Sequence, residues 1–125
     1  MVSGNDELVF QNIQHCSFVQ FPPDMGFCSW QSAQRTMELL TQALGLATVN
    51  MLALDLSRIE RCNSQFLGML IHLYIRAKRQ NKGFCVYQPK PFVLNVIKVM
   101  GLDEVFSVCQ TKEEALLAWN ISPLQ

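Results

Sequence analysis

Apolar and polar positions in the first half of the chain follow two different periods. Residues 8–21 contain short β-favouring runs broken at polar positions, which predict two strands or one hairpin. Apolar residues then recur at spacings of three and four from about Trp30 to Leu44, the pattern of an amphipathic helix that Ser29 caps and Gly45 ends. Met51–Leu56 is apolar almost throughout, as expected of a central parallel strand covered on both faces.

The second half of the chain repeats this alternation. The predicted elements, in chain order, are a helix from Asn63 or Ser64 to about Gln80, a strand over Phe84–Gln88, a helix that begins at Pro91 and is closed by Gly101, a short strand over Val105–Val108, and a helix after the capping box Thr111–Glu114. Strands that alternate with helices at this spacing predict an α/β domain with a mostly parallel sheet and right-handed crossovers.

Composition limits the class of protein. With 125 residues, half of them apolar and 16% charged, the chain is most simply one folded domain with its own core. Ten basic residues balance ten acidic ones, which leaves no excess positive charge to bind nucleic acid. The longest apolar stretch, Leu67–Ile75, is too short to cross a bilayer, so we expect no membrane insertion.

The cysteines and the start of the chain favour a cytoplasmic location. The five cysteines are scattered without a CxxC pair, and His15 and His72 are isolated, so we predict reduced thiols and no metal site. The first residues form no charged-then-apolar leader, and we expect residues 1–7 to be a flexible tail. We therefore expect a cytoplasmic protein without a cofactor.

Residues 61–65, Arg-Cys-Asn-Ser-Gln, interrupt two apolar segments at the point where a strand ends and a helix begins. In open α/β sheets, binding sites lie at the carboxyl ends of strands, which is where this segment is placed. The start of the helix carries unpaired backbone N–H groups and a partial positive charge, which would meet a phosphate on Ser64. Ser64 is either a helix cap or a site of modification, and residue chemistry alone favours the cap.

The helix after this segment has a broad apolar face and a narrow polar stripe. On a helical wheel the stripe contains Gln65, Gly68, His72, Arg76 and Arg79. The apolar face contains Phe66, Leu67, Leu70, Leu73, Tyr74 and Ala77. Met69 and Ile75 lie at the borders of the stripe, and methionine beside glycine forms an adaptable surface for a partner.

A small thiol enzyme is the alternative from a different class. Cys62 is the thiol nearest to this segment, a helix N-terminus lowers a thiol pKa, and His72 would serve as the base. No further pattern supports nucleophilic chemistry, and we predict that the protein is not an enzyme. Asp55, inside an apolar strand, is assigned a structural role near the end of the sheet, and a role in the site stays open.

Residues 51–118 resemble the STAS domain, the fold shared by bacterial anti-sigma factor antagonists and the cytosolic tails of sulfate transporters. The matching segments are, in chain order, Leu54-Asp55-Leu56-Ser57, Asn63-Ser64-Gln65-Phe66-Leu67-Gly68, Lys82-Gly83, Pro91, Met100-Gly101-Leu102, Phe106 and Glu113-Glu114-Ala115-Leu116. The resemblance implies a single α/β STAS-like domain over residues 1–125. Its sheet would have four to five mostly parallel strands, with helices mainly on one face.

The resemblance also implies a non-catalytic switch that regulates transcription. In the antagonists, a serine kinase that doubles as the anti-sigma factor phosphorylates the serine after a motif Asp, a phosphatase reverses this step, and the phosphate breaks the contact. Ser64 occupies that position. We predict that the protein partner contacts Cys62, Asn63, Ser64, Gln65, Phe66, Gly68, Met69, His72 and Ser29. Whether the protein forms a homodimer is a question that the sequence leaves open.

Three positions depart from the family pattern. Asn63 stands in place of the motif Asp, Phe66 in place of the motif Gly, and Ser29 in place of a loop Asp. Asn, like Asp, is a good N-cap residue, so Asn63 is compatible with the fold. Family members without these acids often act as binding modules without the phosphorylation cycle. The alternative is therefore a STAS subunit that docks on a transport or signalling complex without covalent control.

Overall fold

A computed structural model of the protein describes residues 8–121, with side chains to residue 118. The predicted tail, residues 1–7, lies outside the described residues. The strands are β1 (Val9–Ile13), β2 (Cys16–Gln20), β3 (Met51–Asp55), β4 (Gly83–Tyr87) and β5 (Ser107–Cys109). The helices are α1 (Trp30–Leu44), α2 (Ser64–Arg79), α3 (Pro91–Val99) and α4 (Lys112–Ile121).

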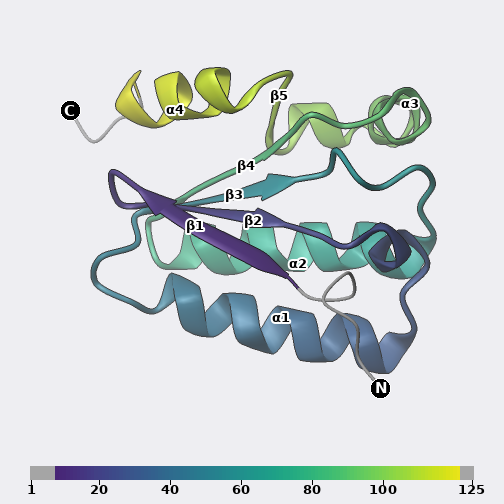
Figure 1. Ribbon diagram of the computed structural model, residues 1–125, viewed down its shortest axis with the longest axis horizontal. Helices are drawn as coiled ribbons and strands as arrows, with labels where there is room; N and C mark the ends of the chain where they lie inside the picture. Colours follow the sequence, from purple (N-terminus) through teal and green to yellow (C-terminus); the bar gives the residue numbers. More distant parts are fainter. Residues whose placement is uncertain (1–7, 122–125) are drawn as a thin grey trace.

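The five strands form one sheet in the order β1-β2-β3-β4-β5 (Figure 1). Strand β1 pairs antiparallel with β2, and every other pair of neighbours is parallel. The first two strands form the predicted hairpin, because Gln14 and His15 both adopt positive φ angles and close a two-residue turn. The mostly parallel sheet is confirmed.

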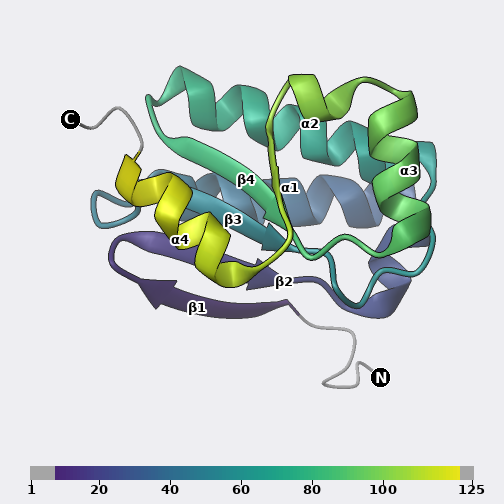
Figure 2. The same ribbon diagram turned by 90° about the horizontal axis from the view of Figure 1, so that it is seen from above.

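The sheet separates two apolar layers (Figures 1 and 2). Helices α1, α2 and α3 supply the larger layer, which is centred on side chains such as Leu40, Leu70 and Ile97. Helix α4 covers part of the opposite face, where Ala115 packs with Phe18 and the neighbouring strand residues. The helices therefore lie mainly on one face, as predicted. Helix α4 covers the other face, so that β3 is buried on both sides, as its continuous apolar sequence requires.

The last strand differs from its prediction. The sequence predicts a strand over Val105–Val108, whereas β5 covers Ser107–Cys109. The backbone N–H groups of Val105 and Phe106 donate to the carbonyl of Leu102, so both residues still belong to a turn. Phe106 fills the core against the ring of Phe84, with ring centroids 5.4 Å apart. Its apolar side chain therefore reflects burial of the turn, although the sequence pattern predicts a strand there.

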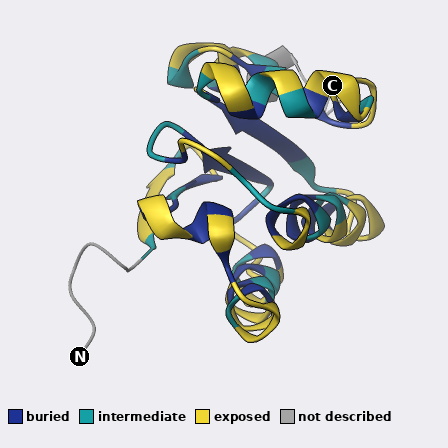
Figure 3. Cartoon of the chain, turned by 90° about the vertical axis from the view of Figure 1, so that its right-hand side faces the viewer, coloured by how far each residue is buried: buried dark blue, intermediate teal, exposed yellow. Residues whose placement is uncertain are grey.

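Helices α1 and α2 begin at the same end of the molecule (Figures 1 and 3). Each follows a parallel strand and returns over the same face of the sheet, so the two helices run side by side in the same direction. Their first turns therefore lie together at the carboxyl ends of β2 and β3. This end carries the predicted site.

Candidate functional site

Asn63 organises the segment between β3 and α2, residues 61–65, which we call the α2 corner. Its side-chain Oδ1 accepts a hydrogen bond from the backbone N–H of Phe66 at 2.9 Å, which makes Asn63 the N-cap of α2. Its Nδ2 donates to the carbonyl of Cys28 at 3.2 Å, and its backbone N–H donates to the carbonyl of Gly26 at 2.7 Å. One residue thus caps one helix and holds the segment that leads into the other.

Gly26 allows this close approach. A Cβ atom built at Gly26 would lie 2.0 Å from the carbonyl oxygen of Arg61 and 2.9 Å from a methyl group of Ile59. No side chain fits in that space. The short 3₁₀ turn Pro23–Phe27 therefore packs its backbone directly on the α2 corner.

Ser64 lies on the surface at the first position of α2. Because Asn63 caps the helix, the hydroxyl of Ser64 is not used as the cap. The backbone N–H groups of Ser64 and Gln65 lie in the first turn, where a helix offers no carbonyl partner of its own. The structure thus removes the capping role that residue chemistry favoured and leaves an exposed hydroxyl beside free donors.

Ser29 has a structural role in the neighbouring helix. Its Oγ accepts a hydrogen bond from the backbone N–H of Ser32 at 3.1 Å and caps α1, as the sequence predicts. Its side chain is exposed, so it remains at the surface beside the α2 corner.

Two of the predicted contact residues are corrected by the structure. Phe66 and Met69 are both buried and so offer no surface to a partner. Phe66 faces the sheet and packs edge-on against the ring of Phe21, with ring centroids 5.6 Å apart. Its bulk fills the core instead of adding to the outer face of the corner.

The polar stripe of α2 is otherwise on the surface. Gln65, His72, Arg76 and Arg79 are exposed. Gly68 is half-buried, and a Cβ atom built there would meet nothing within 4 Å. A cavity of about 400 Å³ between α1 and α2 is lined by His72 and Arg76 from this stripe. The stripe is therefore accessible along much of the helix.

Three exposed aromatic side chains belong to segments that lie at the same end of the molecule as the α2 corner, a feature that sequence reasoning missed. Phe27 is 62% exposed, Trp30 is 61% exposed and Phe92 is 43% exposed. Phe27 lies between two residues that bond to Asn63, Trp30 opens α1, and the guanidinium of Arg61 lies 5.0 Å from the ring centroid of Phe92. We call these three side chains the aromatic rim. Large apolar side chains gathered at one end of a domain indicate a binding surface.

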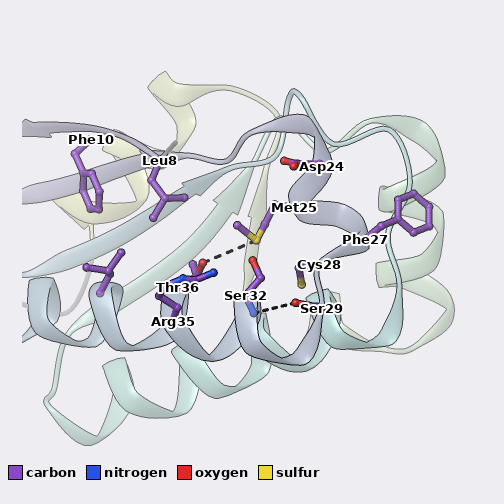
Figure 4. A pocket seen from close by; sticks show the side chains of 11 residues that line it. Leu8, Phe10, Asp24, Met25, Phe27, Cys28, Ser29, Ser32, Arg35 and Thr36 are labelled. Carbon is purple, nitrogen blue, oxygen red and sulfur yellow. Dashed lines mark hydrogen bonds between the residues drawn. The ribbon is translucent and has the colours of Figure 1, made fainter. Parts of the chain in front are cut away.

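A groove of about 820 Å³ continues from this surface along α1 (Figure 4). Leu8 and Phe10 line it from the side of β1, and Met25 and Cys28 line it from the turn before α1. Ser29 lies at the same end of the groove as Cys28, so the groove opens beside the α2 corner.

The structure does not bring together the nucleophile and the base that the enzyme alternative requires. Cys62 is half-buried, and this burial raises the pKa of its thiol above the ordinary value, the opposite of what a nucleophile needs. His72 lies eight positions after Ser64 on α2, roughly 12 Å further along the helix axis. Cys62 and His72 therefore do not form a pair.

Asp55 takes the structural role expected of it. Its Oδ1 accepts from the backbone N–H of Ser57 at 2.8 Å, and its Oδ2 accepts from Nε2 of Gln20 at 3.2 Å. Among the residues that the structure describes, all five cysteines are free and no cluster of three metal-ligating side chains occurs. Within the same part of the chain, no helix has the length and apolar character needed to cross a membrane.

The sheet order and the two layers are those of the fold that STAS domains share. A family model described as "Mlab, STAS domain" matches residues 27–111, which is more than half of the chain. The chain therefore belongs to the STAS domain family.

Solved structures share the fold at low sequence identity. An anti-sigma-factor antagonist (STAS) domain protein from Planctomyces limnophilus is 24% identical, with a TM-score of 0.76 over 89% of this chain and 96% of that one. The anti-sigma factor antagonist SpoIIAA in its unphosphorylated form is 14% identical, with a TM-score of 0.70 over 88% of this chain and 93% of that one. SLC26A9 is 16% identical, with a TM-score of 0.61 over 91% of this chain and 21% of that one.

Proposed function

We propose that this STAS domain is a non-catalytic regulatory module that binds a protein partner through the α2 corner and the aromatic rim. Phosphorylation of Ser64 by a partner serine kinase then weakens the contact. The observation that carries the proposal is that Ser64 is exposed at the first position of α2 while Asn63 performs the capping. The hydroxyl is therefore available to a kinase without cost to the helix.

The surroundings of Ser64 suit a phosphate group. The first turn of α2 offers free N–H groups and the positive end of the helix dipole. Arg61 adds a positive charge on the same corner. A phosphoserine carries about −1.5 to −2 charges at neutral pH. The modified corner would thus stay folded, while the charge of its surface becomes strongly more negative.

The aromatic rim explains why that change would weaken binding. Phe27, Trp30 and Phe92 would lose water when a partner covers them, and aromatic side chains are typical centres of binding energy. A phosphate enclosed by the same interface would have to lose its hydration shell, and a single exposed cation, Arg61, offsets only part of that cost. Structures of SpoIIAA in unphosphorylated and phosphorylated forms show that a protein with this fold carries such a modification.

The partners that follow from this proposal are a serine kinase that doubles as the anti-sigma factor and a phosphatase that restores the free serine. The free cysteines agree with a cytoplasmic setting for these reactions. The neutral Asn63 favours a second candidate, a STAS subunit that docks on a transport or signalling complex through the same surface without covalent control.

To test this, the tagged chain is isolated, in the presence of phosphatase inhibitors, from the organism that naturally produces it. Phosphate is then mapped by peptide mass spectrometry. We expect phosphate on Ser64. The proteins that accompany the wild type should also accompany Ser64→Ala but be lost with Ser64→Asp. Thr48→Asp is the matched control, since Thr48 is an exposed hydroxyl residue in the loop that leads into β3, at the opposite end of the sheet.

The outcomes separate the two candidates. If no phosphate is found and Ser64→Asp retains every partner, the switch is wrong and the docking subunit remains. If a Phe27→Ser, Trp30→Ser double variant also retains every partner at full strength, the docking surface itself is wrong.

A further inference from the structure

A polar cavity lies on the face of the sheet opposite to α1 and α2. Its volume is about 370 Å³, and it is formed by side chains of β1, by side chains on and just after β2, β3 and β4 toward their carboxyl ends, and by the first turn of α4. Cavities of this size hold small molecules. The position at the ends of parallel strands is also the one where α/β sheets usually bind ligands.

Asp55 brings an unneutralised carboxylate to this cavity. The residue is only 8% exposed, and its two hydrogen bonds come from neutral donors, the N–H of Ser57 and the side-chain amide of Gln20. Among the described residues it forms no salt bridge. Each carboxylate oxygen can accept a further hydrogen bond, and a buried carboxylate is stabilised most by a cationic partner.

Tyr87 adds a hydroxyl that lacks a protein partner. The residue is 4% exposed and lines the cavity, and its hydroxyl makes no hydrogen bond to any residue that the structure describes. Tyr87 is the direct cross-strand neighbour of Asp55 in the β3–β4 register, and burial, followed by the charge of Asp55, raises the pKa of Tyr87. The hydroxyl oxygen is not sealed in the core, so it faces the cavity and is open to a partner from outside the protein.

Lys112 supplies the opposite charge. It is the first residue of α4, its ammonium group donates to Oε1 of Gln11, and Nζ lies 4.8 Å from the ring centroid of Phe18. Within the described part of the chain it forms no ion pair. Two of its three N–H groups remain for an anion, and the first turn of α4 adds the partial positive charge of a helix start.

We infer that this cavity binds a small zwitterion of the α-amino acid class, with its ammonium group on Asp55 and Tyr87 and its carboxylate on Lys112. One ligand then satisfies a carboxylate without a cation, a cation without a carboxylate and a hydroxyl without a partner. Glu113, exposed at the same cavity, disfavours ligands with a net negative charge. A zwitterion with no net charge fits this balance.

The test is isothermal titration calorimetry on the intact chain with each protein amino acid in turn. We expect at least one to bind with a Kd of about 1 mM or below, which corresponds to about −4 kcal/mol. Its decarboxylated amine and its deaminated acid should each bind about tenfold or more weakly. Failure of every amino acid to bind, or equally tight binding of the amine alone, would overturn the inference.

Three variants locate the site. Asp55→Asn, Tyr87→Phe and Lys112→Gln should each weaken binding about tenfold, since each removes one ligand contact. Lys98→Gln and Glu104→Gln are the controls, because both residues are exposed and do not line this cavity. If Asp55→Asn does not fold, Tyr87→Phe and Lys112→Gln decide alone. Unchanged binding in those two would reject the site, and Ser64→Asp should leave binding unchanged because Ser64 does not line the cavity.

Discussion

The side-chain amide of Asn63 donates to the main-chain carbonyl of Cys28, 3.2 Å away and 35 positions earlier in the chain. This hydrogen bond joins the start of α2 to the segment that enters α1. It makes the two helix starts, with Ser64 and the aromatic rim, one continuous surface whose parts keep a fixed spacing. A partner would meet this surface already ordered, which lowers the entropy lost on binding.

The first prediction separates the roles of two adjacent residues. Asn63→Ala removes the cap of α2 and leaves the carbonyl of Cys28 without its donor. We expect the free energy of unfolding to fall by about 1–2 kcal/mol in urea titrations. Ser64→Ala should change it by less than about 0.5 kcal/mol, because Ser64 caps nothing. Equal losses in the two variants would mean that Ser64 has a structural role after all.

A second prediction compares two glycines. Gly26→Ala forces a methyl group against the carbonyl oxygen of Arg61, and we expect a loss of about 1–3 kcal/mol in thermal or urea unfolding. Gly68→Ala is the control, since a Cβ there meets nothing within 4 Å and alanine favours the helix. That variant should be more stable than wild type by about 0.5–1 kcal/mol. A stable Gly26→Ala protein would show that the turn and the corner are not in close contact.

Local sequence patterns predicted most of the elements because their signals lie within one turn or one strand. The helix α1, its cap Ser29 and the central strand follow from spacing alone. The choice between Asn63 and Ser64 as cap did not, because both residue types suit the position and the tie to Cys28 is a tertiary contact. That contact decides the cap.

Phe66 shows where two kinds of reasoning disagree. The helical wheel places it on the apolar face, whereas its position in the family motif placed it among the contact residues. The structure follows the wheel, because a large ring in the first turn of α2 gains more by packing on Phe21 than by exposure. The aromatic rim and the polar cavity were beyond prediction. Their members come from separate elements that only the folded sheet brings together.

The burial of Phe66 gives a third prediction. Phe66→Ala should lower the free energy of unfolding by about 3–5 kcal/mol, because it leaves a cavity beside Phe21 in the larger core. Phe92→Ala is the matched control. Its ring is partly exposed, so its removal should cost about 1 kcal/mol or less while it reduces partner binding. A small effect of Phe66→Ala on stability would place its ring outside the core.

The last prediction concerns the pH dependence of thiol labelling. Only the thiolate reacts, and burial raises the pKa of Cys62 above its ordinary value and that of Cys16 to about 12. At about pH 7.5 the thiolate fraction of Cys62 is therefore smaller than that of a free thiol, and it grows about tenfold with each pH unit until the pKa is reached. We expect native Cys62 to react with a thiol reagent more slowly than the urea-unfolded chain does at the same pH.

The labelling rate of Cys62 should rise steadily toward alkaline pH, and Cys16 should react more slowly still. The variant Cys62→Ser identifies the labelled site by mass. An activated nucleophile would behave in the opposite way, with fast labelling that is already independent of pH near neutrality, and that result would return the enzyme alternative to consideration.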